Sequence, residues 1–200
     1  MLVLRSSDAS PFGRKVKTAA HLLGLFDRIE IVAADTADPS EVLRQQNPLG
    51  KIPALILEDG MVIYDSRVIV DYLDHLAGGG RLIPALAGER YPALVLQALA
   101  DGIMDAALLQ VYETRWRDET ARSERWATHQ AGKVERGLAA LASTDLSGAR
   151  HIGHIAVACA LGYLDLRFAG EWRRQHPALA DWLAGFEAAT PAFAATRPKG

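Results

Sequence analysis

Residues 47–55 have a pattern that would let their backbone form hydrogen bonds with a peptide-like ligand. Pro53 comes at the entrance to a short apolar strand predicted over residues 54–57. A proline lacks an N–H and so belongs at the first residue of a strand or on an edge. If the Ile52–Pro53 bond is cis, we expect the backbone of Ile52 to stay unpaired, so that an extended ligand can join it like an added strand. From composition alone, an ordinary trans proline is the alternative.

Asp65 and Ser66 open a predicted helix soon after this strand. A tight turn at residues 58–60 and a second strand at residues 62–64 separate them from it. Free backbone N–H groups and the helix dipole favour an anion at a helix start. Plain N-capping by Asp or Ser is the alternative. The helix itself is predicted from apolar residues spaced at i, i+3, i+4 and i+7, namely Ile69, Tyr72, Leu73 and Leu76.

Ser10 and Pro11 have the pattern of another helix start, with serine as N-cap and proline at the first helical position. Gly24 is a natural C-terminal stop for this helix. A third start is predicted at Asp38, which is followed by Pro39 and then by Glu41 at N3.

Strand and helix signals alternate only in the first part of the chain. Strands are predicted at residues 2–4 and 29–33, and with the elements above they give the order β-α-β-α-β-β-α. Residues 78–84 form a glycine-rich break that ends in a proline and suits a linker. Beyond it only helices are predicted, at residues 90–117, 121–143 and 152–168 and between Pro177 and Pro191.

Composition excludes several classes of protein. Of the 200 residues, 50% are hydrophobic and 23% are charged, which is typical of a soluble globular protein, and a net charge of −2 offers no attraction for nucleic acid or an anionic membrane. No apolar run approaches the roughly 18 residues of a membrane span. The single cysteine, Cys159, excludes an internal disulfide, and the histidines have no spacing that suits a metal. We expect a cytoplasmic protein without a metal.

The three motifs together, residues 10–15, residues 47–53 and the Asp65-Ser66 pair, resemble those of the bacterial glutathione S-transferase family. The resemblance covers essentially the whole chain. It implies an α/β thioredoxin-like glutathione-binding domain at residues 1–78, a linker at 79–84 and an all-α helical-bundle domain at 85–200. It also implies a homodimer.

The resemblance implies glutathione as co-substrate and a role for each motif. The Ser10 hydroxyl would donate to the glutathione thiolate and so lower its pKa. Ile52, exposed by a cis Pro53, would pair with the cysteinyl part of the tripeptide, and Lys51 would meet the glycyl carboxylate. Asp65 would meet the ammonium group and Ser66 the γ-glutamyl carboxylate. Ser6, Ser7 and the backbone amide of Ala9 are alternatives to Ser10 at the thiol. Helix capping by Ser10 and a solvated Lys51 are also open.

The implied reaction is attack of the thiolate on a hydrophobic electrophile, bound in an apolar pocket for which Phe12, Tyr112 and Trp116 are candidates. A glutathione-dependent isomerase or dehalogenase uses the same thiolate and stays open. So does a non-catalytic interaction protein that keeps the fold. The electrophile is not indicated.

One departure from the family concerns the helix predicted at residues 152–168. The family usually opens this helix with Ser or Thr followed three positions later by Asp, a capping box. Here His151 and His154 occupy those places. We expect neither to be a good cap, at a cost of about 1 kcal/mol in local stability.

Overall fold

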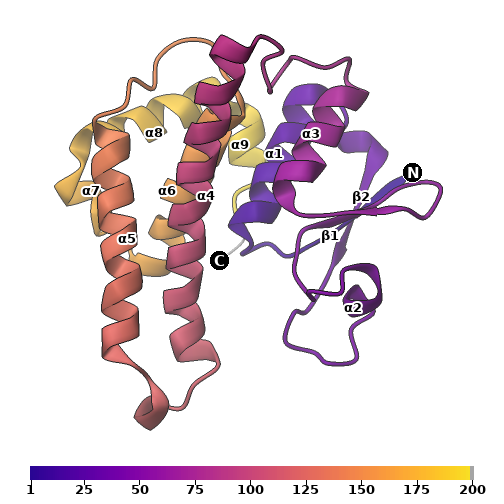
Figure 1. The fold of residues 1–200 in the computed structure, drawn as a ribbon. Helices are drawn as coiled ribbons and strands as arrows, with labels where there is room; N and C mark the ends of the chain where they lie inside the picture. Colours follow the sequence, from indigo (N-terminus) through magenta and orange to yellow (C-terminus); the bar gives the residue numbers. More distant parts are fainter. Residues whose placement is uncertain (199–200) are drawn as a thin grey trace. The chain divides into compact units, whose positions relative to one another are not determined.

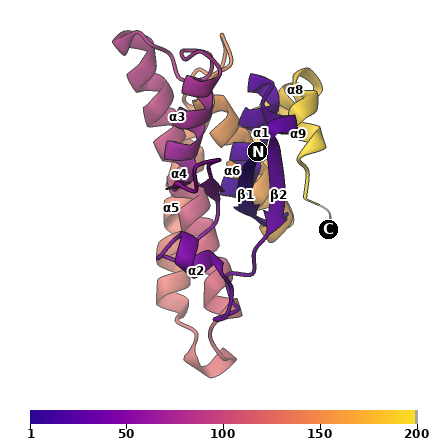
Figure 2. The ribbon, with the colours of Figure 1, turned by 90° about the vertical axis from the view of Figure 1, so that its right-hand side faces the viewer.

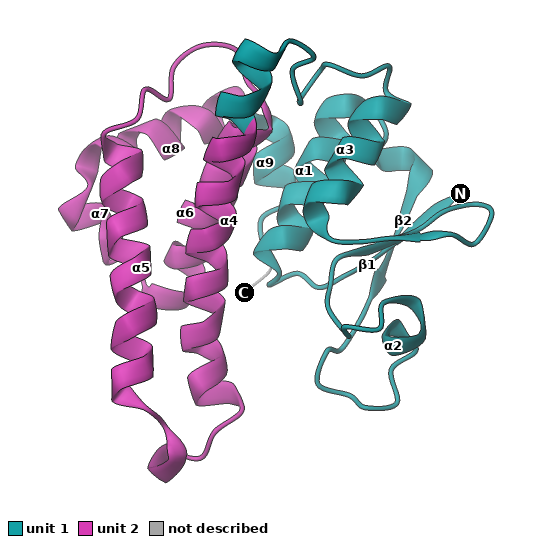
Figure 3. Ribbon diagram, in the orientation of Figure 1, with its two compact units in different colours: residues 1–93, 190–200 teal, residues 94–189 magenta. Residues whose placement is uncertain are grey.

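The computed structural model describes residues 1–198, which form two compact units (Figure 3). Unit 1 contains residues 1–93 and the C-terminal segment from Thr190 onward, and unit 2 contains residues 94–189. The predicted division at residues 79–84 stays a prediction.

Unit 1 is built on a four-stranded sheet in the order β2-β1-β3-β4 (Figure 1). Its strands are β1 (Leu2–Ser6), β2 (Ile29–Ala33), β3 (Ala54–Ile56) and β4 (Val62–Ile63). β1 is parallel to β2 and antiparallel to β3, which forms a hairpin with β4. The mixed sheet confirms the predicted order of elements.

Helices α1 (Pro11–Leu23) and α3 (Ser66–Leu76) pack against each other on one face of this sheet (Figure 1). Their core contains Val16, Ile69 and Leu73, which are fully buried because the apolar spacing of each helix turns them to the same side. The predicted ends of α1 are confirmed: the Gly13 N–H donates to Ser10 Oγ at 3.0 Å, and Gly24 ends the helix at φ 73°. A short 3-10 turn, η1 (Phe26–Arg28), leads into β2.

The helix start predicted at Asp38 is wrong. Helix α2 covers only Leu43–Gln46. Asp38 Oδ1 instead accepts from the backbone N–H of Ser40 at 2.8 Å and from its hydroxyl at 2.7 Å, which closes a local turn. Asp and Ser side chains compete in this way with helical hydrogen bonds, so the same residue types serve a cap and a turn equally well.

The glycine-rich segment after α3 is held in place by one carboxylate. Asp74, 4% exposed, accepts from the backbone N–H groups of Gly80, Arg81 and Leu82 at 2.8, 3.1 and 2.6 Å. The Arg81 guanidinium donates to the carbonyl of Leu23 at the end of α1, at 3.0 Å. The segment is therefore fastened to α1 and α3.

The C-terminal segment returns to unit 1 as α9 (Pro191–Ala195), beside α1 (Figures 1 and 2). The Arg14 guanidinium donates to the Phe193 carbonyl at 3.0 Å and lies 3.6 Å above the centre of the Phe193 ring. One turn further along α1, the hydroxyls of Thr18 and Thr196 are 3.0 Å apart. These contacts fasten α1, the helix that Ser10 begins.

Unit 2 contains helices only in its described residues, as predicted. They are the larger part of α4 (Ala87–Arg115), η2 (Glu119–Ala121), α5 (Glu124–Ala142), α6 (Ile152–Phe168), α7 (Trp172–Gln175) and α8 (Pro177–Ala189). By length and composition α4 would pass as a membrane span, a test that core helices also pass, and 44% of its apolar window is buried. Gly137 brings α5 close to α4, because a Cβ there would lie 2.5 Å from Ile103 Cγ1. Cys159 is fully buried.

The expectation that His151 and His154 cap α6 poorly is wrong. The Gly153 N–H donates to His151 Nδ1 at 3.1 Å, and the His151 N–H donates to His154 Nδ1 at 3.2 Å. Both rings must then be neutral, with the proton on Nε2. Burial lowers the pKa of His151, and burial, His151 and Arg150 lower the pKa of His154 to about 4 despite the opposing effect of Asp145. Two imidazoles thus replace the hydroxyl and carboxylate of the usual capping box.

This cap makes stability depend on pH. The ordinary pKa of His154 is 6.5 and its folded value is about 4. Between these two pH values the unfolded chain therefore binds a proton at His154 that the folded chain does not bind. The free energy of unfolding should be constant above about pH 7 and fall between 6.5 and 4. Denaturant titrations at a series of pH values would measure this.

The double variant His151→Ser, His154→Asp restores an ordinary capping box and should flatten the pH dependence in that window. His75→Gln, a change near the end of α3, is the control and should keep it. An unchanged slope in the double variant would contradict a role for the imidazole cap.

Candidate functional site

Ser10 lies between the end of β1 and the start of α1, and it is 9% exposed. Its oxygen accepts from Gly13, so its hydroxyl proton remains to be donated to another group. The first turn of α1 also places the positive end of the helix dipole here. Capping and a role at a thiolate are therefore compatible, because one uses the oxygen and the other the proton.

Gly13 allows β1 and α1 to approach closely at this point. A Cβ on residue 13 would lie 2.0 Å from Ser6 Oγ and 3.3 Å from Ser10 Oγ. A side chain on residue 13 would fit only if Ser6 moved aside. Gly13 was not predicted as a site residue, because a glycine inside a predicted helix gives no local sign of a close neighbour.

The Ile52–Pro53 peptide bond is cis, as predicted. Within the described chain the backbone N–H and C=O of Ile52 have no hydrogen-bond partner. Asn47, 2% exposed, shapes the turn before them: its amide donates to the Lys51 carbonyl at 2.8 Å, and its Oδ1 accepts from the Leu49 N–H at 3.1 Å. Asn47 was not predicted as a site residue, although an Asn that begins an N-P-x-G turn is a recognisable signal.

Asp65 caps α3 as an N-cap, with Oδ1 accepting from the Arg67 N–H at 3.0 Å. The peptide bond between Tyr64 and Asp65 is also cis. Ser66 follows at the first helical position and is 2% exposed. Its hydroxyl makes no hydrogen bond among residues 1–198, so this start of a helix keeps a polar group that capping does not use.

The topology of the sheet brings these motifs to the same end of its strands. β3 is antiparallel to β1 with Ala54 opposite Arg5, so Pro53 lies at the C-terminal end of β1, from which the chain leads to Ser10. β4 is antiparallel to β3 with Ile63 opposite Leu55, so β4 also finishes at this end of the sheet, just before Asp65. A hydroxyl at a helix start, an unpaired backbone segment and a second helix start thus meet at one end of the sheet.

The other predicted site residues lie in different parts of the molecule. Lys51 is exposed next to the cis peptide, without an ion pair among the described residues. Phe12 is half-buried in the first turn of α1 in unit 1. Tyr112 and Trp116 belong to unit 2, one turn apart at the end of α4, with Trp116 55% exposed. A pocket that joins Phe12 to this pair stays a prediction.

Within residues 1–198 no three His, Cys, Asp or Glu side chains come together as they would around a metal ion. The predicted site residues at this end of the sheet offer the hydroxyls of Ser10 and Ser66, the backbone of Ile52, the carboxylate of Asp65 and the ammonium of Lys51. Such a set suits hydrogen bonding to a charged, extended organic molecule.

Comparison with known proteins identifies the family. Residues 9–76 match the glutathione S-transferase N-terminal domain, and residues 106–185 match the glutathione S-transferase C-terminal domain. The chain belongs to the glutathione S-transferase family. The first match contains Ser10, the segment 47–53 and the Asp65-Ser66 pair, and it confirms the resemblance.

Similar proteins include bacterial and plant members of this glutathione S-transferase family. An uncharacterized GST-like protein, YibF, from Escherichia coli is 32% identical over 82% of both chains, and glutathione transferase GST 23 from Zea mays is 30% identical over 94% of this chain and 75% of its own length. A family member from Pseudomonas fluorescens, solved with bound glutathione, has a TM-score of 0.94 at 44% identity, with both chains fully covered. A structure from Methylobacillus flagellatus with glutathione bound has a TM-score of 0.91 at 37% identity, again over both whole chains.

The close approach at Gly13 predicts the effect of a single methyl group. Gly13→Ala should lower the free energy of unfolding by about 1–3 kcal/mol, because the Cβ must push Ser6 aside. Gly185→Ala in α8 is the control: its Cβ has open space, and replacing a helical glycine by alanine should stabilise by roughly 0.5–1 kcal/mol. Urea unfolding measures both. A Gly13→Ala protein as stable as Gly185→Ala would contradict the close packing.

Proposed function

We propose that this protein is a glutathione transferase that binds glutathione at the end of the sheet where β1 and β4 finish and β3 begins. The observation that carries the proposal is that Ser10, the unpaired Ile52 backbone and Ser66 all lie at that end of the sheet. Relatives at 44% and 37% identity have been solved with glutathione bound, which supports the same co-substrate here.

Each group matches one part of the tripeptide. The Ile52 N–H and C=O pair with the cysteinyl residue as an added strand would. The Ser66 hydroxyl and the start of α3 receive the γ-glutamyl carboxylate, and the Asp65 carboxylate meets the ammonium group. The exposed Lys51 meets the glycyl carboxylate. Ser10, at the start of α1, is then left for the thiol.

Ser10 makes the thiol reactive by stabilising its ionised form. A free cysteine thiol has a pKa near 8.5, and hydrogen bonds to the thiolate lower it. The thiol releases its proton to solvent, and the sulfur donates its electron pair to an electrophilic carbon, either displacing a leaving group or adding to a polarised double bond. Catalysis comes from thiolate stabilisation and positioning, without a covalent bond to the enzyme. Phe12, Tyr112 and Trp116 are the proposed apolar contacts of the electrophile.

We also propose that the protein acts as a homodimer in the cytoplasm. Met61 and Val68, near the β4 and α3 part of unit 1, are 60% and 50% exposed, and a partner subunit would cover such apolar side chains. The single buried cysteine suits a reducing compartment.

Glutathione binding tests the proposed site. The wild type should bind glutathione in calorimetry, and Ser66→Ala should bind it about 10- to 100-fold more weakly, because a hydrogen bond to a charged group contributes about 1.5–3 kcal/mol. Ser143→Ala, at the end of α5, is the control and should bind normally. No binding by the wild type at millimolar glutathione would overturn the proposal and favour an interaction protein.

The role of Ser10 is tested by the ionisation of bound glutathione. Ser10→Ala should raise the pKa of the bound thiol, measured by ultraviolet thiolate absorption, and lower kcat/KM with a general electrophile by 10- to 100-fold. Ser123 caps α5 in the same way, with its Oγ 3.2 Å from the Trp126 N–H, so Ser123→Ala controls for a lost cap. A Ser10→Ala enzyme with an unchanged thiol pKa would show that Ser10 is only a cap. Binding without conjugation in the wild type would favour a specialised isomerase or dehalogenase.

A further inference from the structure

Unit 2 contains a cavity of about 340 Å³ that the proposed transferase reaction does not use. Its lining residues all belong to unit 2, and they come from the loop between α5 and α6, from the first turn of α6 and from α8. One wall is aromatic, because the rings of Trp182 and Phe186 stack with their centres 5.3 Å apart. The volume lies at the lower end of the range for small-molecule sites.

A buried imidazole lines this cavity. His154 is 4% exposed, and its Nδ1 accepts from the His151 N–H, so the ring is neutral and its proton is on Nε2. The Nδ1 side of the ring faces the backbone, which leaves the Nε2 side for the cavity. Among residues 1–198 the Nε2–H group has no acceptor. A buried donor without an acceptor costs free energy, and a ligand with an acceptor would recover it.

The second polar group of the cavity is the half-buried guanidinium of Arg150. It donates to the Ala189 carbonyl at the end of α8, at 3.0 Å, and lies 5.5 Å from the centre of the Phe186 ring. Within the described chain no carboxylate pairs with it, so its other N–H groups are available. Burial, His151 and Arg150, in that order, lower the pKa of His154, so Arg150 lies near this imidazole.

The acidic side chains near this cavity are engaged elsewhere. Asp145 is close to His154, but its carboxylate accepts from the Ser147 N–H at 2.9 Å. Glu187 of α8 interacts with Arg173 of α7. No aspartate or glutamate is found among the described residues that line the cavity. Its polar side chains therefore offer donors, which suit an anion.

The aromatic wall is held in place before any ligand binds. The Trp182 indole N–H donates to the Leu146 carbonyl at 3.1 Å, which fastens the loop between α5 and α6 to α8. Gly185 lies between Trp182 and Phe186 in the sequence, and a Cβ there would meet no atom within 4 Å. A preformed cavity with open space lowers the entropy cost of binding.

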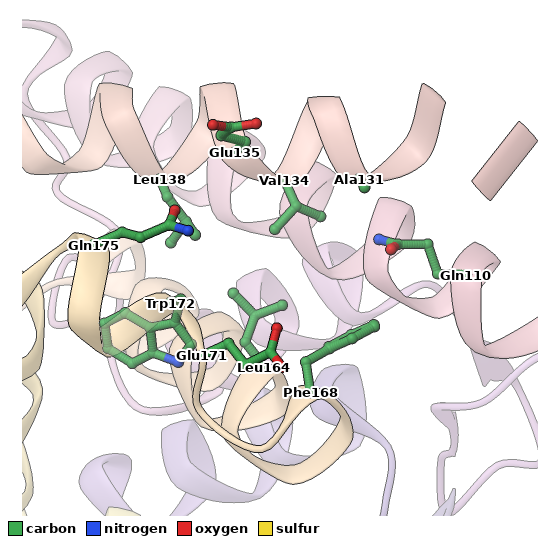
Figure 4. A pocket seen from close by; sticks show the side chains of 10 residues that line it. All are labelled: Gln110, Ala131, Val134, Glu135, Leu138, Leu164, Phe168, Glu171, Trp172 and Gln175. Carbon is green, nitrogen blue, oxygen red and sulfur yellow. The ribbon is translucent and has the colours of Figure 1, made fainter. Parts of the chain in front are cut away.

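Two other cavities of unit 2 are lined by charges that water already solvates. The cavity between α5 and the α6–α7 turn, shown in Figure 4, has Glu135 and Glu171 among its lining residues. A third, between α4 and α5, has Lys133 and Arg136. All four side chains are exposed, so their charges gain little from a ligand. The buried donor of His154 distinguishes the cavity beside α8 from both.

We propose that this cavity beside α8 binds a small organic anion, a carboxylate on a flat apolar body of one or two rings. The carboxylate accepts from His154 Nε2–H and from the Arg150 guanidinium, and the rings lie against Trp182 and Phe186. Hydrogen bonds to a carboxylate are stronger than those between neutral groups, and an arginine can donate two at once. Stacking on the aromatic wall contributes further.

The test compares two probes that share one ring system. Calorimetry at about pH 7.5, above the ordinary pKa of histidine, should show that 2-naphthoate binds and that 2-naphthamide binds at least about tenfold more weakly. Arg150→Gln should weaken naphthoate binding about tenfold or more, because it removes a charged donor. Arg125→Gln removes the same charge from the exposed first turn of α5 and should leave naphthoate binding unchanged.

Two further variants fix the place of binding. Gly185→Leu puts an apolar side chain into open space in the cavity and should abolish naphthoate binding without a change of charge. His154→Asp keeps an acceptor for the His151 N–H and replaces the donor by a carboxylate, so it should abolish binding while α6 stays capped. In nuclear magnetic resonance, the indole N–H signal of Trp182 should shift with naphthoate in the wild type and stay in place in Gly185→Leu.

Four outcomes would each overturn the proposal: no binding of naphthoate, equal binding of the two probes, an Arg150→Gln protein that binds like Arg125→Gln, or unchanged binding by Gly185→Leu. Glutathione binding, measured on the same proteins, reports separately on the proposed transferase site.

Discussion

The backbone pairing of β1 with strands on both sides is the constraint on which the candidate glutathione site depends. β1 is parallel to β2 and antiparallel to β3, and the β3–β4 hairpin extends the sheet on that side. This register brings the chain after β1, the chain before β3 and the chain after β4 to the same end of the sheet. Ser10, Ile52 and Asp65, far apart in sequence, therefore lie at the same end of the sheet because of backbone hydrogen bonds rather than contacts among themselves.

Helix starts supply much of the chemistry in this protein. The first-turn N–H groups of a helix need partners, and the side chain that satisfies one of them often keeps a second polar atom. Ser10 uses its oxygen to cap α1 and retains a proton, while Asp65 caps α3 and leaves the Ser66 hydroxyl unused. At α6 two imidazoles do the same work as a hydroxyl and a carboxylate, and the price is a requirement that both remain neutral.

Both units pair or hydrogen-bond their buried and partly buried charges. In unit 1, Asp74 receives three backbone N–H groups, and Arg5 lies 2.6 Å from Glu41. In unit 2, the half-buried carboxylate of Asp165 accepts from Arg173 and from the Trp172 indole N–H. A charge taken out of water is costly unless such partners are present.

Local patterns were sufficient for much of the fold. The alternation of strands and helices, the caps of α1 and the span of α6 followed from apolar spacing and capping residues, because these depend on neighbours within one or two turns. The cis bond at Pro53 and the link between the three motifs came from the family resemblance, not from composition. The helix start at Asp38 and the caps at His151 and His154 were predicted wrongly, because Asp, Ser and His side chains can each bond to more than one backbone group.

The sequence by itself determined the family and the order of elements, since the motifs that indicate them are contiguous in the chain. Tertiary structure alone decided the close approach of Gly13 to Ser6, the role of Asn47 in the turn before Pro53, and the hydrogen bond from the Trp172 indole to Asp165. Each of these depends on atoms that a turn or a neighbouring helix brings within a few ångströms. Contacts of that kind produce no pattern in the sequence, so only the folded structure shows them.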